Sequence, residues 1–98
     1  MRLVLATMIA VATFAGPVRA QSPEAAQMLA LTCAACHGPD GVGAGGIPAL
    51  RGHTKDYLLT MLKAFRAGER PSTVMGRLAK GYGDAEIDAL AVYFAALK

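Results

Sequence analysis

The stretch Cys33-Ala34-Ala35-Cys36-His37 decides how this chain of 98 residues folds. Residues three apart lie on one face of a helix, so both thiols can reach a single flat ligand. The imidazole of His37 then follows from the same side. This C-x-x-C-H spacing is the pattern by which haem is attached through two thioether bonds. A thiol-redox or zinc protein is the alternative, and the histidine directly after the second cysteine disfavours it.

The N-terminal residues predict export. Met1-Arg2 is a positive start, residues 3–15 form a nearly unbroken apolar run, and Val18-Arg19-Ala20 has the small residues of a cleavage site. We therefore expect residues 1–20 to be a Sec-type signal peptide that is removed in the periplasm. A membrane anchor is the alternative, but the apolar run is shorter than the roughly 20 residues that cross a bilayer. Residues 21–98 would form the mature domain, with no membrane span.

The mature chain is small and nearly neutral. Removing 20 residues from 98 leaves 78, a length at which the hydrophobic core is marginal. Both cysteines belong to the haem motif, so we expect the haem to stabilise the fold and the apo-protein to be largely unfolded. Loss of Arg2 and Arg19 leaves eight of the ten basic residues against seven acidic ones. This balance argues against nucleic acid as a partner.

Basic residues are concentrated in the middle of the chain. Between residues 51 and 80 the local charge is +5, because seven basic residues face only Asp56 and Glu69. Such a segment can neutralise the haem propionates or dock an acidic partner. A solvated helix face is the alternative. The basic residues are Arg51, Lys55, Lys63, Arg66, Arg70, Arg77 and Lys80.

The mature sequence predicts three main helices and no strand, hence an all-α fold around one haem. The first helix is capped by Ser22-Pro23-Glu24 and runs into Cys33. Thr54 caps the second, which ends at Gly68. Asp84 caps the last. The apolar stripes are Tyr57, Leu58, Met61, Leu62 and Phe65 on the second helix, and Ile87, Leu90, Ala91, Phe94 and Leu97 on the last.

A glycine-rich loop follows the haem motif. Within it, Gly41-Val42-Gly43-Ala44-Gly45-Gly46 fits the G-x-G-x-x-G pattern of dinucleotide-binding folds. That pattern requires a strand before it and a helix after it. Here the haem helix precedes it and Ile47-Pro48 follows. We interpret the glycines as residues that let the backbone pass close to the haem edge.

The haem iron needs a second axial ligand, and Met75 is the predicted one. It lies in a segment rich in Pro, Ser, Thr and Gly, far enough after His37 to reach the distal side, with a short turn over residues 74–80. Met28 is on the helix of the haem motif, Met61 is in an apolar stripe typical of core packing, and His53 follows the glycine loop too soon. A thioether opposite an imidazole raises the reduction potential, which suits electron transfer rather than substrate binding.

Further residues are candidates for contacts around the haem. The second ring nitrogen of His37 needs an acceptor, and we expect a backbone carbonyl in residues 45–48, with Pro48 favoured. Pro48 could instead serve only to end the glycine stretch. Tyr82 and Arg51 are candidates for hydrogen bonds to the haem propionates. No residue is assigned a catalytic role.

Taken together, these motifs resemble class I cytochrome c over the whole mature chain. The resemblance rests on Cys33 to His37, Gly38-x-Asp40-Gly41, Pro48-x-Leu50, a middle helix, Met75 and a C-terminal helix. Residues 70–82, Arg-Pro-Ser-Thr-Val-Met-Gly-Arg-Leu-Ala-Lys-Gly-Tyr, are similar to the haem subunit of flavocytochrome c sulfide dehydrogenase. Arg51 and His53 depart from that family, in which small and amide residues are expected.

The resemblance implies one haem c, with Cys33 and Cys36 as thioether sites, His37 as proximal ligand and Met75 as distal ligand. It also implies a heterodimer with an FAD-containing flavoprotein that oxidises sulfide, while the haem passes single electrons to a small soluble acceptor protein. Such a chain is an electron-transfer subunit and not catalytic on its own. A free-standing periplasmic electron carrier is the alternative function.

Overall fold

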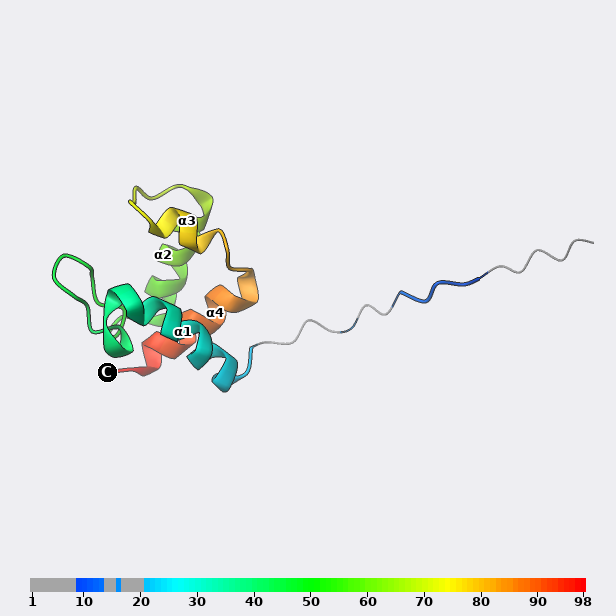
Figure 1. Ribbon diagram of the computed structural model, residues 1–98, viewed down its shortest axis with the longest axis horizontal. Helices are drawn as coiled ribbons and strands as arrows, with labels where there is room; N and C mark the ends of the chain where they lie inside the picture. The colour runs from blue at the N-terminus through cyan, green and yellow to red at the C-terminus, as the bar shows by residue number, and fades with distance from the viewer. Residues whose placement is uncertain (1–8, 14–15, 17–20) are drawn as a thin grey trace, which may run out of the picture.

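Four helices form the domain in this computed structural model, which describes residues 9–13, 16 and 21–98 (Figure 1). Most of the predicted signal peptide, including residues 17–20 at its expected cleavage site, lies outside the described residues. The division into a signal peptide and a mature domain therefore stays a prediction. The elements are α1 (Pro23–His37), the short 3-10 turn η1 (Pro39–Gly41), α2 (Lys55–Ala67), α3 (Met75–Ala79) and α4 (Asp84–Ala96).

The predicted start of α1 and both predicted ends of α2 are confirmed. The Ser22 hydroxyl accepts a hydrogen bond from the Ala25 N–H at 3.1 Å, and the Thr54 hydroxyl accepts one from the Tyr57 N–H at the same distance. These hydroxyls satisfy donors that have no partner within the helix. Gly68 ends α2 in the left-handed conformation, with φ 72°. The helix α1 continues past Cys33 to His37, so the whole haem motif is helical.

The predicted cap of α4 is wrong by one residue. Gly83 is the N-cap, and Asp84 is the first helical residue. The Glu86 carboxylate accepts the Gly83 N–H at 3.1 Å. Asp84 instead accepts a hydrogen bond from the Arg66 guanidinium at 2.5 Å, which joins the start of α4 to the end of α2.

This ion pair gives the fold a pH dependence in acid. The hydrogen bond from Arg66, and the attraction of its charge, lower the pKa of the Asp84 carboxyl. A carboxyl with a depressed folded-state pKa stabilises the fold above its unfolded pKa, and this contribution disappears as the pH falls through the folded value. We expect Asp84→Asn to lose less stability than the wild type between about pH 5 and about pH 2. Denaturant midpoints of both holoproteins across this range test it, and equal losses would contradict it.

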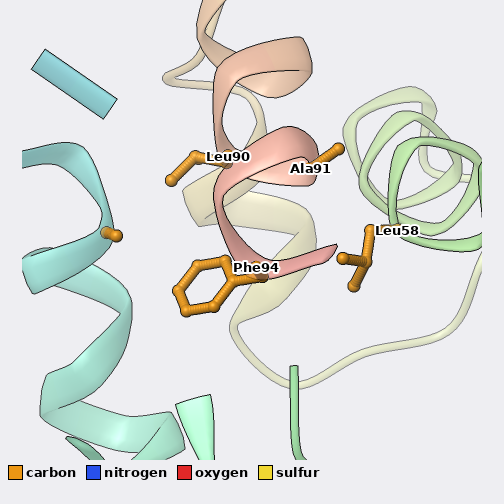
Figure 2. Packing of buried hydrophobic residues seen from close by; sticks show 5 residues of the cluster. Leu58, Leu90, Ala91 and Phe94 are labelled. Carbon is orange, nitrogen blue, oxygen red and sulfur yellow. The ribbon is translucent and has the colours of Figure 1, made fainter. Parts of the chain in front are cut away.

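The core lies on α4, which packs against both α1 and α2 (Figure 1). Figure 2 shows Leu90 and Phe94 on the side of α4 that faces α1, and Ala91 pointing toward Leu58 of α2. These residues are buried, and so are Ala30 of α1 and Ile87 of α4. The apolar stripe predicted for the last helix is therefore confirmed from Ile87 to Phe94, while Leu97 is half-buried beyond its end.

The all-α prediction is confirmed. Over residues 21–98 the chain forms no β-strand, and a single bridge joins Ala44 to Ile47 within the glycine loop. Within the described part of the chain, no helix combines the length and the apolar character needed to cross a bilayer. The short turn expected around residues 74–80 is the five-residue helix α3, which packs on α2.

Candidate functional site: a haem cavity

A cavity of about 490 Å³ lies between the helices and brings the haem motif and Met75 together. Its wall contains both thiols, the imidazole of His37 and the thioether of Met75, contributed by α1 and α3. The remainder of the wall is mostly apolar. A volume of this size falls within the range of cofactor pockets, roughly 300–1,000 Å³. The four residues predicted to hold the haem therefore line the same cavity.

His37 is buried, with 7% of its surface exposed, at the last turn of α1. Its Nδ1 lies 2.6 Å from the carbonyl oxygen of Pro48. Because a carbonyl oxygen only accepts hydrogen bonds, Nδ1 must carry the proton. This tautomer leaves a lone pair on Nε2, the form in which an imidazole ligates a metal. A backbone carbonyl of residues 45–48, with Pro48 favoured, was the acceptor expected for this ring nitrogen, and the structure has Pro48 in that position.

The glycine loop brings the Pro48 carbonyl to His37 by folding back on itself. The Gly43 N–H donates to the His37 carbonyl at 2.6 Å, and the Gly41 carbonyl accepts from the Leu50 N–H at 2.8 Å. Gly41 has φ +68°, and a Cβ there would lie 2.9 Å from a ring carbon of Phe94. Gly43 thus lies close to the backbone of the returning loop, and Gly41 lies close to Phe94 of α4. Of the loop glycines, Gly46 lines the cavity, and an approach of the loop backbone to the haem edge stays a prediction.

The two thiols differ in exposure. Cys33 is half-buried and Cys36 is exposed, and neither forms a disulfide. Burial raises the pKa of the Cys33 thiol, and a hydrogen bond involving Thr32 partly offsets this. Both thiols lie on the cavity side of α1, as the spacing of three residues on a helix requires.

Two methionines, rather than one, line the cavity. Met75 is half-buried at the first position of α3, whose first turn is held by a hydrogen bond from the Gly76 N–H to the Ser72 hydroxyl at 2.8 Å. Met61 of α2 also lines the cavity, where it would pack against the haem rather than against another helix. Its sulfur accepts a hydrogen bond from Arg70 at 3.2 Å. Met28 is 67% exposed on α1 and is absent from the cavity wall.

The apolar stripe of α2 faces the cavity. All five residues predicted for it line the wall, and only Leu58 of these is buried against the protein. A helical stripe that remains open in this way implies a large apolar ligand that completes the core. The five residues are Tyr57, Leu58, Met61, Leu62 and Phe65.

The remaining candidates occupy different positions. The Tyr82 hydroxyl lies in the cavity wall, 3.0 Å from the Thr32 hydroxyl of α1. Arg51 lies outside the wall, and its guanidinium donates to the backbone carbonyl of Lys98. The expected contact of Arg51 with a haem propionate is therefore not supported. His53 lines the cavity, stacked on the Tyr57 ring with centroids 4.4 Å apart.

Comparison with known proteins agrees with this geometry, because the family model of cytochrome c matches residues 23–98. The chain belongs to the cytochrome c family. It is 48% identical over 68 residues to the cytochrome subunit of sulfide dehydrogenase from Chlorobaculum tepidum, covering 69% of this chain and 62% of that one. It is 45% identical over 67 residues to the thiosulfate dehydrogenase electron acceptor of Stutzerimonas stutzeri, covering 64% and 31%.

A solved structure has the same fold. Thiosulfate dehydrogenase from Marichromatium purpuratum superposes with a TM-score of 0.72 at 36% identity, covering 90% of this chain and 22% of that one. This cytochrome spans less than two thirds of the length of each of these three relatives.

Membership of this family implies a covalently bound haem c, and the residues present fit such a group. Two thiols at helical spacing can form the thioether bonds, and a buried imidazole with its Nδ1–H already bonded can ligate the iron. The open apolar stripe of α2 provides surface for a porphyrin face. The roles of the individual residues stay predictions.

Proposed function

We propose that this cytochrome is the electron-accepting haem subunit of a periplasmic sulfide dehydrogenase. In this proposal residues 1–20 are a cleaved signal peptide and residues 21–98 carry one haem. Cys33 and Cys36 hold the haem, and His37 and Met75 ligate its iron. The observation that carries the proposal is that all four residues line the same cavity. The 48% identity to a cytochrome subunit of sulfide dehydrogenase supports the choice of electron donor.

The chain's own residues would hold the site ready for electron transfer. The bond from His37 to the Pro48 carbonyl fixes the ring, and the apolar wall excludes water. Such a site changes little between the two oxidation states, which favours rapid electron exchange. The haem supplies a one-electron couple. Oxidation of sulfide to the level of elemental sulfur releases two electrons, so the FAD-containing partner would deliver them one at a time, and a small soluble protein would accept them.

Purification from the native host tests the subunit role. The full-length chain, carrying an affinity tag, is expected to co-elute with a flavoprotein whose spectrum shows FAD. Adding sulfide to the complex is expected to reduce the haem much faster than adding it to the cytochrome alone, which controls for direct chemical reduction. A cytochrome that never co-elutes with a flavoprotein would leave the free-standing carrier as the better proposal.

A second electron donor is favoured by a separate observation. Two of the three relatives described above are the electron acceptor of thiosulfate dehydrogenase and thiosulfate dehydrogenase itself. If this chain serves that enzyme, the purified complex is expected to respond to thiosulfate and not to sulfide. Haem reduction, followed by absorbance after addition of sulfide or of thiosulfate, separates the two electron donors.

A further inference from the structure

The wall of the haem cavity contains one permanently charged side chain. Among the described residues that line it, Arg70 is the single member of the group Arg, Lys, Asp and Glu. The residue is exposed overall, which places it at the mouth of the cavity. A haem c carries two propionate groups. The wall therefore offers one fixed cation to a ligand that carries two carboxylates.

Contacts within the cavity hold the Arg70 guanidinium in place. Its central carbon lies 5.4 Å from the centroid of the Phe65 ring, over the ring face, and Nη1 lies 3.2 Å from the Met61 sulfur. A cation over an aromatic face is attracted to it and loses side-chain freedom. Both contacts come from the stripe of α2 that lines the cavity. The guanidinium is thus oriented by the wall against which the haem packs.

Arg70 has no carboxylate partner within the described residues. The two ion pairs there join Lys55 to Asp88 and Arg66 to Asp84. A planar guanidinium with five N–H donors is suited to bind a carboxylate through two parallel hydrogen bonds. A phenyl ring and a thioether satisfy few of these donors. The remaining donors of this exposed side chain are open to solvent and are therefore available to an anionic group of the ligand.

We propose that Arg70 is a positioning residue that pairs with a haem propionate and thereby raises the reduction potential. Oxidation adds a positive charge at the iron, and a nearby cation opposes it. Removing the cation would also leave a carboxylate unpaired in a largely apolar site, which favours the oxidised state. The proposal rests on haem binding in the cavity and not on the identity of the electron donor. Failure of the sulfide dehydrogenase proposal would therefore leave it intact.

Arg70→Gln and Arg77→Gln form a matched pair of tests. Each variant removes one positive charge from the same segment, but Arg77 is exposed on α3 and lies outside the cavity wall. Redox titration of the two holoproteins is expected to show a clearly larger fall in midpoint potential for Arg70→Gln. Added salt is expected to weaken the effect at Arg77 more than the effect at Arg70, because a pair in direct contact is screened less than a distant charge.

Equal shifts in the two variants would overturn the proposal, since they would reflect total charge alone. A lower denaturation midpoint of Arg70→Gln with an unchanged potential would also overturn it, because the contacts with Phe65 and Met61 would then be purely structural. If Arg70→Gln yields no holoprotein, Arg70→His decides. Its imidazole gains a charge between about pH 8 and about pH 5.5, so its potential is expected to approach the wild-type value in acid. A constant difference from the wild type over this range would reject the pairing.

Discussion

Replacement of both cysteines, Cys33→Ala with Cys36→Ala, is expected to abolish covalent haem attachment and most of the helix content. The cavity of about 490 Å³ would then lack its ligand. The apolar residues of its wall would then lose the ligand surface that shields them from water, a loss of about 25 cal/mol per Å² of apolar surface. A single core of fewer than 80 residues rarely supplies more than about 5 kcal/mol. Far-UV circular dichroism of the purified variant measures the loss.

A control separates loss of the haem from loss of the thiols. The unmodified chain, produced in cells that cannot attach haem, keeps both cysteines and is expected to be equally unfolded. A double variant that retains the full helix signal would show that the protein part alone stabilises the fold. The same result in the unmodified haem-free chain would confirm that conclusion.

Replacement of the proposed distal ligand, Met75→Ala, is expected to produce the largest change in the redox properties. Axial ligands set haem potentials over a range of about 0.8 V. Loss of the thioether removes the ligand that favours ferrous iron, so the midpoint potential is expected to fall. The weak near-infrared absorption band of methionine-ligated ferric haem is expected to disappear. Absorption spectra and redox titration of the holoprotein measure the two effects.

Met61→Ala is the matched control, because Met61 and Met75 both line the cavity and are both half-buried. If Met75 is the ligand, this control retains the near-infrared band. The opposite pattern, with the band lost at Met61 and kept at Met75, would reassign the ligand to α2. Since the sulfur of Met61 already accepts a hydrogen bond from Arg70, we expect the band to depend on Met75.

The sequence was sufficient for features that depend on neighbouring residues. Ser22 and Thr54 cap helices because a hydroxyl at that position accepts a nearby N–H, and the glycine at position 68 permits the left-handed end of α2. The spacing of Cys33 and Cys36 placed both thiols on one helix face. Pro48 was predictable as the acceptor for His37 because its ring stiffens the loop that follows the haem motif.

Features that depend on tertiary packing were not predictable. A helical stripe of apolar residues looks the same whether it packs on protein or on a cofactor, so the cavity-facing role of Met61 was missed. Arg51 was a candidate for a hydrogen bond to a haem propionate because it is basic. The chain returns at the end of α4, and the Arg51 guanidinium donates to the Lys98 carbonyl instead. Arg70 differs from the other basic residues in lining the cavity, where it contacts Phe65 and Met61, and neither property can be read from the sequence.

The orientation of the α2 stripe has a consequence for the amount of protein that survives in a cell. Without haem, the apolar face from Tyr57 to Phe65 has no surface to cover it. A chain in that state spends much of its time open, and proteases cleave proteins from the open state. Degradation would then remove the haem-free chain selectively. The steady-state abundance of this protein would therefore report how efficiently its haem is attached.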